Sequence, residues 1–341
     1  QHGITLYKGC KVEAIDRVNK TVTSANGITE GYDKLVIATG SVPFIIPVPG
    51  ANLAGVVTYR DLDDVNVMML AARSKGRAVV IGGGLLGLEA AAGLNEQGMD
   101  VTVVHVMPTL MERQLDPAAG YLLGESMKAR GIKVMTSANT KQILGDKRVI
   151  GVEFADGSVI PADLVVMAVG IRPNVALAKT AELAANRGIV VDAQMRTSDP
   201  SIYALGECVE VNGATFGLVA PLYDMANVLA AQLCGDDKAT FTPVATATRL
   251  KVTGVNLYSA GDFAEGDDRE EIVLRDASAG VYKRLILKDD RIIGTVLYGD
   301  TGDGPWFYDM LKRSVDTREM RDTLIFGKNY QGGAPLDPTA A

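Results

Sequence analysis

Three glycines at the spacing Gly82-x-Gly84-x-x-Gly87 form the pattern in this sequence that points most directly to chemistry. They stand between an apolar strand pattern and a helical pattern. In such a turn the first glycine allows a tight bend, the second lets a diphosphate touch the backbone, and the third lets helix and strand pack closely. The helix N-terminus then offers free N–H groups and a positive dipole end to the phosphates. The pattern predicts a nucleotide-binding site that extends over Leu85 and Leu86.

His105 occupies the position, at the end of the second strand, where such a domain usually carries an acidic residue for the ribose 2′-OH. An imidazole cannot reproduce the two-acceptor contact of a carboxylate. Its ring could hydrogen-bond one hydroxyl or, when protonated, meet a 2′-phosphate together with Arg113. An equally open alternative is a partly exposed ring that stacks loosely on the adenine. The sequence therefore leaves the choice between NADH and NADPH open.

Glu89 lies two residues beyond Gly87, in the first turns of the same helix. An acidic side chain near a helix N-terminus is stabilising on dipole grounds alone. The functional alternative is a polar contact near the nicotinamide end of a bound dinucleotide. The residue types leave both roles open.

The elements that must position these residues alternate between apolar strands and helices, which predicts an α/β fold with a doubly wound parallel sheet. In chain order we expect a helix at 61–74, a strand at 77–81, a helix at 85–97, a strand at 101–106, a helix from Asp116 to Gly131 and a strand at 163–169. Short strands at 140–144, 149–154 and 158–160, with the turn Asp156-Gly157, predict an antiparallel meander inside this region.

Further elements flank the parallel sheet on both sides. Before it we expect short strands at 5–7, 10–15, 21–23 and 34–38, with a turn at Asn26-Gly27. After it come a strand at 188–191 and an apolar helix at 221–233 that opens at Pro221. A small α+β region follows, with strands at 248–252, 270–274, 282–287 and 291–297 and a helix at 306–314.

Two strands end in similar sequences, Ile37–Gly40 and Ala168–Gly170, on either side of the glycine turn. This arrangement resembles the two-dinucleotide-binding flavoprotein family, which includes glutathione reductase and the ferredoxin and rubredoxin reductases. The segment Thr197–Glu207 is similar to the second FAD motif of that family, with Glu207 in place of its closing Asp. The resemblance implies an FAD-binding domain that is interrupted by an NAD(P)-binding domain.

Longer motifs are similar to the large subunits of NAD(P)H-dependent assimilatory nitrite reductases. These motifs are Gly84–Ala91, Met111–Asp116, Gly206–Glu210, Gly217–Asp224 and Thr248–Phe263, and the similarity spans about residues 1–326. The resemblance implies a flavoprotein oxidoreductase of nitrate assimilation. In it NAD(P)H gives a hydride to FAD, and electrons pass singly to iron–sulfur and sirohaem centres outside this chain.

The resemblance also implies which residues contact the two cofactors. The NAD(P)H set is Gly82, Gly84, Leu85, Leu86, Gly87, Glu89, His105, Arg113 and Gly170, and the FAD set is Val12, Thr39, Gly40, Glu207 and Pro221. The helix that opens at Pro221 would direct its N-terminus at the pyrimidine edge of the flavin. No catalytic residue is assigned.

Two departures from the family are expected to matter. The family's FAD domain begins with its own GxGxxG, which does not precede Gln1, so we expect a truncated start and no FAD diphosphate cradle. The Cys clusters for the iron–sulfur and sirohaem centres are also absent from the sequence. Its cysteines are Cys10, Cys208 and Cys234, with no CxxC spacing, and its two histidines are His2 and His105. We therefore expect no metal site and no catalytic thiol.

The expected domains follow from these motifs and from Pro-rich and Gly-rich stretches. Residues 1–50 form part of an FAD-binding domain, 51–171 an NAD(P)-binding domain, 172–243 the rest of the FAD-binding domain, 244–326 a C-terminal α+β domain and 327–341 a disordered tail.

Composition excludes several other classes of protein. The 341 residues carry 34 basic and 41 acidic side chains, a net charge of −7, which argues against nucleic acid and anionic membranes as partners. No stretch predicts a membrane span, and few, unpaired cysteines favour the cytoplasm. Expected partners are the metal-bearing segments of the parent enzyme, a small subunit, and a second copy in a homodimer. The alternatives are a free-standing ferredoxin or rubredoxin reductase and a nucleotide-binding fragment without turnover.

Overall fold

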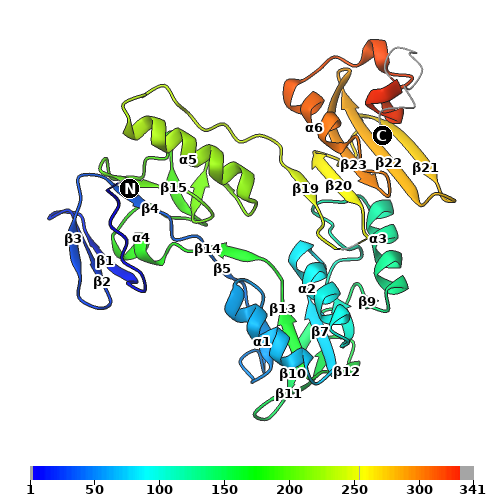
Figure 1. The fold of residues 1–341 in the computed structure, drawn as a ribbon, viewed down its shortest axis with the longest axis horizontal. Helices are drawn as coiled ribbons and strands as arrows, with labels where there is room; N and C mark the ends of the chain where they lie inside the picture. Colours follow the sequence, from blue (N-terminus) through cyan, green and yellow to red (C-terminus); the bar gives the residue numbers. More distant parts are fainter. Residues whose placement is uncertain (1–2, 253, 331–341) are drawn as a thin grey trace. The chain divides into compact units, whose positions relative to one another are not determined.

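The computed structural model describes residues 3–252 and 254–330, which group into two compact units. Unit 1 combines the chain up to Val42 with Ile171–Val244. Unit 2 combines Pro43–Gly170 with the chain from Ala245 onward. Figure 1 shows the elements of each unit, and each unit is described by itself below.

A five-stranded parallel sheet forms the centre of unit 2. Its strand order is β6 (Val56–Thr58), β13 (Leu164–Met167), β7 (Arg77–Ile81), β8 (Asp100–Val104) and β9 (Lys133–Met135). Apolar side chains alternate between its two faces, and both faces are buried. In β7, Ala78 and Val80 belong to one core cluster, and Val79 and Ile81 belong to another. Near-continuous apolar runs are what a parallel sheet that is covered on both faces requires.

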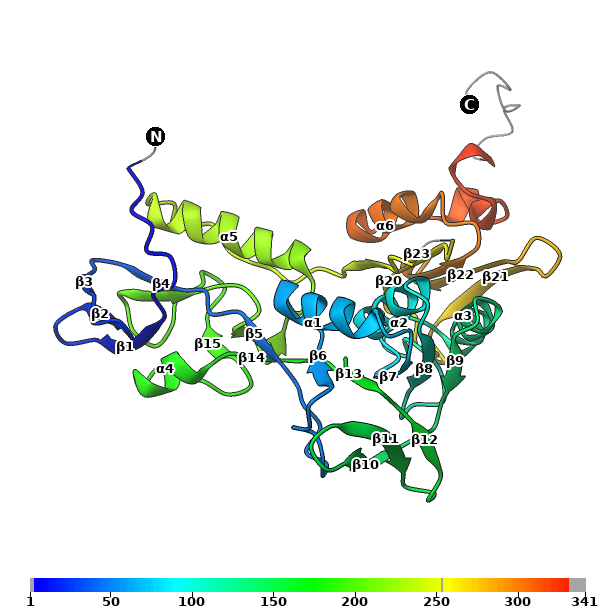
Figure 2. The ribbon, with the colours of Figure 1, turned by 60° about the horizontal axis from the view of Figure 1, so that its bottom comes forward.

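Helices cover one face of this sheet and an antiparallel meander covers the other (Figure 2). The helices are α1 (Leu62–Ala72), α2 (Leu85–Glu96) and α3 (Pro117–Ala129), and the meander is β10 (Thr140–Gly145), β11 (Val149–Phe154) and β12 (Val159–Pro161). Asp61 caps α1 reciprocally with Asp64, and Asp116 caps α3. The sheet and its covering elements agree with the predicted α/β class, which is confirmed.

The C-terminal part of unit 2 is an antiparallel sheet with a helix on one face. The strand order is β19 (Ala247–Arg249), β20 (Leu257–Gly261), β23 (Arg291–Tyr298), β22 (Val281–Lys288) and β21 (Glu270–Asp276), with α6 (Gly304–Arg313) packed against it. The short 3-10 helices η1 (Arg318–Met320), η2 (Leu324–Phe326) and η3 (Lys328–Tyr330) follow. Tyr282 and Val296 on the other face join the core beneath α2 and α3.

A buried polar cluster joins this antiparallel sheet to α3. Asp116 Oδ2 accepts hydrogen bonds from the Tyr282 hydroxyl and from Arg284, the latter at 3.3 Å. Arg284 also pairs with Glu271. Burial, and then the hydrogen bond to Asp116, raises the pKa of Tyr282 above its ordinary value. The phenol is therefore a neutral donor at physiological pH.

In its described residues, from Gly3 onward, unit 1 contains three small sheets and two helices around one core. The antiparallel meander is β1 (Val12–Asp16), β2 (Thr21–Ser24) and β3 (Thr29–Gly31), the parallel pair is β4 (Leu35–Ile37) and β16 (Ile202–Ala204), and the third sheet is β15 (Ile189–Val191), β17 (Val209–Val211) and β18 (Ala214–Thr215). The helices are α4 (Ala176–Thr180) and α5 (Val219–Leu233). Strands β5 (Ser41–Pro43) and β14 (Ile171–Pro173) pair where the chain leaves unit 1 and returns to it.

One expected strand is absent, and several observed elements were not predicted, among them β3 and β20. Residues 5–7 form no strand because they pair with no other strand among the described residues, and Leu6 is 72% exposed. Strand β3 was not predicted because Thr29–Gly31 has no apolar residue. Strand β20 was not predicted because small residues fill its buried middle and it shows no alternation. Of the tail expected at 327–341, residues 331–341 lie outside the described residues. No helix in the described part of the chain has both the length and the apolar character needed to cross a bilayer.

Candidate functional site

The glycine turn between β7 and α2 has the geometry that a diphosphate site requires. Gly82 adopts φ +122°, and a Cβ there would collide with the carbonyl oxygen of Ala168. A Cβ on Gly87 would collide with the carbonyl oxygen of Gly82. At Gly84, by contrast, a Cβ would meet nothing within 4 Å. Packing within the protein therefore requires two of the glycines, whereas the third leaves its backbone open to a ligand.

The N-terminus of α2 presents N–H groups that no side chain caps. Gly84 is the N-cap residue, its backbone is extended, and it makes no side-chain cap hydrogen bond. The first turn carries no acidic residue, and Leu86 is 41% exposed beside the half-buried Leu85. Uncapped N–H groups at the positive end of the helix dipole favour an anion. The turn and the helix start thus combine into one candidate phosphate site.

The topological switch point of the sheet lies beside this turn, between β7 and β13, where the strand order reverses. From β7 the chain passes through α2 to β8 on one side, and β13 pairs with β7 on the other side. Nucleotides bind at such a switch point, at the carboxyl ends of the strands. Gly170 follows β13 with φ +111°, and a Cβ there would meet nothing within 4 Å. The structure therefore brings Gly170 to the sheet edge that carries the glycine turn.

Glu89 of α2 is anchored by the C-terminal part of unit 2. Its Oε1 accepts a hydrogen bond from the Lys251 N–H at 3.2 Å, and the side chain is half-buried. Burial, and then the charge of the nearby Glu89 carboxylate, raises the pKa of Tyr59, which directly follows β6 at the same sheet edge. A carboxylate and a neutral phenol thus stand close together at this edge. The contact of Glu89 with a nicotinamide stays a prediction.

His105 is only 8% exposed, so the alternative of a partly exposed, loosely stacked ring is wrong. The Gly83 N–H donates to its Nδ1 at 3.1 Å, and its Nε2 lies 2.9 Å from Glu112 Oε2. Because Nδ1 accepts a hydrogen bond, the ring proton is on Nε2, which donates to the carboxylate. Backbone hydrogen bonds to Met135 and Ala138 fix His105 at this strand end and bury its ring. Both ring nitrogens are therefore engaged within the protein.

Arg113 was expected to assist His105 at a 2′-phosphate. Its side chain is exposed and makes no hydrogen bond or ion pair in the part of the chain that the structure describes. A joint contact would require a protonated His105, and protonation of Nδ1 would break its hydrogen bond from Gly83. The structure places Arg113 on the same loop as Glu112, one residue further along the chain.

In unit 1 the carboxyl ends of the parallel strands β4 and β16 bring together part of the predicted FAD set. The Ser41 hydroxyl donates to Glu207 Oε2 at 2.7 Å, and the Thr39 hydroxyl donates to the Asn174 carbonyl at 2.7 Å. Gly40 adopts φ +65°, and a Cβ there would meet nothing within 4 Å. Thr39, Gly40 and Glu207 therefore share one edge that has open space beside its backbone.

Val12 and Pro221 lie on other elements of unit 1. Val12 opens β1 and is 36% exposed. The expectation that α5 begins at Pro221 is wrong, because the helix begins at Val219 with Leu218 as its N-cap. Proline is tolerated at this third helical position because the N–H groups of the first turn have no partner inside the helix. The N-terminus of α5 has no side-chain cap.

The described residues contain neither a disulfide nor a group of side chains arranged as a metal site. All three cysteines are free, and the buried Cys208 thiol donates to the carbonyls of Leu205 at 3.2 Å and Ile37 at 3.7 Å. Within residues 3–252 and 254–330, no three side chains of His, Cys, Asp or Glu cluster as metal ligands would.

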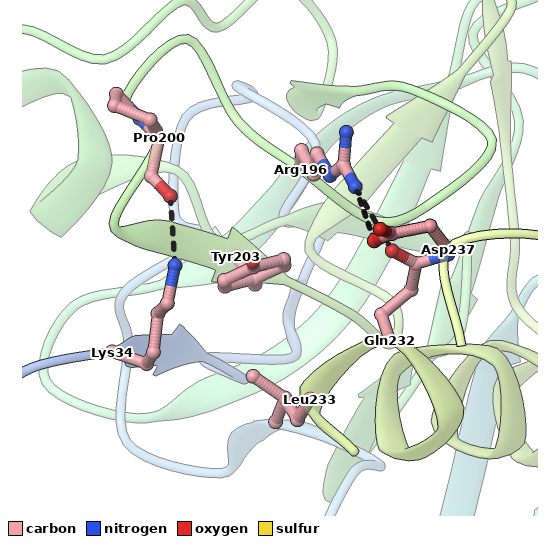
Figure 3. A pocket seen from close by; sticks show the side chains of 7 residues that line it. All are labelled: Lys34, Arg196, Pro200, Tyr203, Gln232, Leu233 and Asp237. Carbon is pink, nitrogen blue, oxygen red and sulfur yellow. Dashed lines mark hydrogen bonds and ion pairs between the residues drawn. The ribbon is translucent and has the colours of Figure 1, made fainter. Parts of the chain in front are cut away.

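A cavity of about 340 Å³ opens in unit 1, and none of the predicted site residues lines it (Figure 3). Lys34 Nζ donates to the Pro200 carbonyl at 3.4 Å. Arg196 contacts Gln232 at 3.0 Å and Asp237 at 3.4 Å. Arg196 is paired with an acidic side chain, and Lys34 donates to a backbone carbonyl, so the charge of each cation is already directed at a group of unit 1 itself.

Three residues of these arrangements were not predicted from the sequence: Ser41, Tyr59 and Glu112. Ser41 could have been found, because it directly follows the predicted glycine at a strand end. Tyr59 belongs to no motif, and Glu112 lies inside the motif Met111–Asp116 but no role was assigned to it. Their places depend on which strand neighbours which and on how a loop folds back.

Comparison with known proteins bears on the whole chain. The family described as pyridine nucleotide-disulphide oxidoreductase matches residues 1–232, and the rubredoxin NAD+ reductase C-terminal domain matches residues 247–315. The chain is 46% identical over 325 residues to the nitrite reductase (NAD(P)H) of Bacillus subtilis (strain 168). It is 42% identical over 325 residues to the assimilatory nitrate reductase electron transfer subunit of the same organism. Each alignment covers 95% of this chain but only 40% and 42% of those proteins.

A solved structure agrees with these matches. The ferredoxin reductase for the CYP199A2 system from Rhodopseudomonas palustris superposes with a TM-score of 0.82 at 30% identity. The superposition covers 93% of this chain and 80% of that chain. The resemblances that the motifs carried, to the nitrite reductase large subunits and to the two-dinucleotide-binding flavoproteins, are confirmed.

Proposed function

The chain belongs to the pyridine nucleotide-disulphide oxidoreductase family, and we propose that it is the NAD(P)H- and flavin-handling portion of an assimilatory nitrite reductase. In that role bound FAD would supply the chemistry that takes a hydride from NAD(P)H and passes electrons singly to iron–sulfur and sirohaem centres outside these 341 residues. The observation that carries the proposal is the open glycine turn at Gly84, in a chain that spans about two fifths of its nitrite reductase relative.

The residues of unit 2 fit a nicotinamide dinucleotide. A diphosphate would lie against the open backbone of Gly84 and the uncapped N–H groups of α2. The switch point between β7 and β13 would place the rest of the molecule past Gly170, and Glu89 would form the polar contact at the nicotinamide end. These residues bind and orient the coenzyme, whereas the redox chemistry belongs to the cofactors.

The residues of unit 1 fit one part of FAD and not another. Open space beside Gly40, with Thr39 and Glu207 at the same edge, suits a sugar-like chain with hydroxyl groups. The diphosphate of FAD would need a second glycine turn, and these 341 residues contain only one, at Gly82–Gly87. In our proposal Val12 and the N-terminus of α5 near Pro221 complete the flavin contacts.

The proposed domains keep the boundaries that the motifs suggested. Residues 1–50 and 172–243 belong to the FAD-binding domain, 51–171 to the NAD(P)-binding domain and 244–326 to the C-terminal domain. The chain passes between the two compact units at 42/43, 170/171 and 244/245. The last two positions lie one residue from the proposed boundaries 171/172 and 243/244, and the first lies eight residues before 50/51. The proposed partners are the redox-active segments or subunits of the parent enzyme, in a reducing compartment such as the cytoplasm.

The test is coenzyme binding followed by electron transfer. The purified chain is titrated calorimetrically with ADP-ribose, and then assayed for NADH-dependent reduction of ferricyanide with and without added FAD. We expect ADP-ribose binding, and dye reduction that requires FAD. Absence of ADP-ribose binding would remove the proposed function altogether.

A second candidate is a free-standing reductase for ferredoxin or rubredoxin. The ferredoxin reductase superposition covers 80% of that chain, and the C-terminal match is to a rubredoxin reductase domain. Direct reduction of added ferredoxin or rubredoxin by the FAD-loaded chain would favour this candidate. A third, a nucleotide-binding module without turnover, rests on the single glycine turn, and ADP-ribose binding without dye reduction would favour it.

A further inference from the structure

The loop that follows β8 folds back onto the glycine turn. The Met111 N–H donates to the Gly83 carbonyl at 3.0 Å, and the Gly83 N–H donates to His105 Nδ1 at 3.1 Å. Leu110 and Met111 are buried, and Met111 adopts φ +52°, which a non-glycine residue keeps only where its surroundings enforce it. Both backbone groups of Gly83 are therefore committed to this loop, and the loop is fixed against the turn.

Glu112 extends from this loop to the ring of His105. Its Oε2 accepts the hydrogen bond from His105 Nε2 at 2.9 Å, and its side chain is 29% exposed. Its Oε1 makes no hydrogen bond or ion pair within the described ranges. The carboxylate is thus held through one oxygen, and the other oxygen of this partly exposed side chain is available to accept a hydrogen bond from a hydroxyl group.

We propose that Glu112 accepts a hydrogen bond from the 2′-hydroxyl of the coenzyme's adenosine ribose, and that His105 is the positioning residue that holds Glu112 there. This inference rests on the proposed nucleotide site. In an NAD-binding domain of this type a carboxylate near the end of the second strand accepts a hydrogen bond from the ribose 2′-hydroxyl, whereas a nearby Arg accommodates the 2′-phosphate of NADP. Here His105 occupies that strand end, its nitrogens are both engaged, and it draws in a carboxylate from the following loop.

The negative charge of Glu112 also predicts which coenzyme the site prefers. A carboxylate at the ribose repels a 2′-phosphate, so this site selects NADH over NADPH. Arg113 is the opposing feature, because an exposed guanidinium one residue away would attract a 2′-phosphate. Glu112 is the more strongly positioned of the two, since His105 holds it and Arg113 has no partner within the described residues.

The experiment measures binding of two fragments that need no flavin and no turnover. The full chain and its Glu112→Gln variant are titrated calorimetrically with ADP-ribose and with 2′-phospho-ADP-ribose. We expect the wild-type chain to bind ADP-ribose more tightly. Glu112→Gln should weaken ADP-ribose binding by about 10- to 100-fold, the range for loss of a hydrogen bond to a charged acceptor. The same variant should bind 2′-phospho-ADP-ribose no more weakly than wild type does.

Matched variants separate the roles of the three residues. Arg113→Gln, which removes the neighbouring charge, tests whether that charge contributes to binding of 2′-phospho-ADP-ribose. Glu125→Gln, which breaks the exposed ion pair with Lys128 on α3, is the control and should leave ADP-ribose affinity unchanged. His105→Ala should weaken ADP-ribose binding only while Glu112 is present, and His105→Gln, which keeps a donor for the carboxylate, should restore part of the affinity. The melting temperature of each variant shows whether it is folded.

The outcomes distinguish this inference from the proposed function. If the wild-type chain binds neither fragment, both are overturned. If it binds ADP-ribose and Glu112→Gln binds it equally well, only the inference is overturned. A wild-type preference for 2′-phospho-ADP-ribose that Arg113→Gln abolishes would assign the site to Arg113 instead.

Discussion

Both units end a parallel strand next to glycines, but different constraints act on those glycines. In unit 2, side chains at Gly82 or Gly87 would collide with backbone carbonyl oxygens. In unit 1, Gly40 and Gly206 adopt φ +65° and +94°, yet a Cβ at either would meet nothing within 4 Å. Packing inside the protein explains the first pair. Backbone conformation alone requires glycine at Gly40 and Gly206. The space beside these two residues is not filled by atoms of unit 1 and is open to a ligand.

The units also differ in what their buried carboxylates connect. Asp116 in unit 2 accepts hydrogen bonds from side chains of the C-terminal sheet. Glu210 in unit 1 accepts from the backbone N–H groups of Arg187 at 2.9 Å and Gly188 at 3.2 Å. Those backbone bonds, with the one from Gly188 foremost, lower the pKa of Glu210 below its ordinary range. The carboxylate of Asp116 therefore joins a helix to the C-terminal sheet, whereas the carboxylate of Glu210 closes a local loop.

The largest expected effect tests that joining role. Asp116→Ala should lower the free energy of unfolding of unit 2 by about 3–5 kcal/mol, because it leaves Arg284 and Tyr282 buried with a lost partner and removes the cap of α3. Urea unfolding measures the loss. Asp100→Ala, which breaks the exposed pair with Lys133, is the control and should cost less than about 1 kcal/mol. Equal losses in both variants would contradict a joining role.

The next effect separates packing from ligand access within the glycine turn. Gly87→Ala should destabilise unit 2 by about 1–3 kcal/mol, because its Cβ has no room. Gly84→Ala should leave the melting temperature nearly unchanged, because its Cβ enters open space, yet weaken ADP-ribose binding at least about tenfold by blocking the backbone. Calorimetry on both variants checks the pair. A Gly84→Ala variant that binds normally would show that the diphosphate lies elsewhere.

The parallel sheet of unit 2 was predictable because each of its longer strands is an apolar run next to a helix with clear start and stop signals. Asp116 followed by Pro117 marks the start of α3, and Gly98 follows the end of α2. Strand β20 was not predictable, because its buried residues are small and have no alternation. Local signals therefore identified the elements that combine a long apolar run with clear start and stop residues.

The candidate site was predictable only where a motif is continuous in the sequence. Gly82–Gly87 form one turn, as their spacing implied. The burial of His105 was not predictable, because it depends on backbone bonds to the end of β9 and on the Gly83 N–H. Glu112 was missed for the same reason: its carboxylate reaches the strand end through a loop, and no residue spacing records that path.

A smaller effect is expected where unit 1 uses glycine for conformation alone. Gly206→Ala should cost about 1 kcal/mol, because φ +94° strains a residue that carries a Cβ although no atom obstructs it. Gly93→Ala, in the helix α2 with φ in the helical range and open space, is the control and should be neutral or stabilising. Thermal unfolding compares the two. A loss as large as that of Gly87→Ala would remove the difference between the units.

The smallest effect concerns the half-exposed pair between Arg77 and Asp163 in unit 2. Hydrogen bonds from the Arg77 side chain and backbone lower the pKa of Asp163 to about 2, against an ordinary value of 3.8. Because the folded-state pKa is the lower one, the pair stabilises the fold above pH 3.8, and this contribution is lost as the pH falls toward 2. Asp163→Asn should cost less than about 1 kcal/mol at pH 7 and nothing at pH 2, since solvent screens the pair. Urea unfolding of both proteins from pH 2 to pH 7 checks this, and the difference between them should rise with pH only below about pH 4.

In unit 1, Asp199→Asn should change the free energy of unfolding with the same sign and pH dependence, because the Ser201 N–H and then Arg17 lower the pKa of Asp199. A difference that persists at pH 2 in either unit would mean that the carboxyl acts there through its shape rather than through its charge.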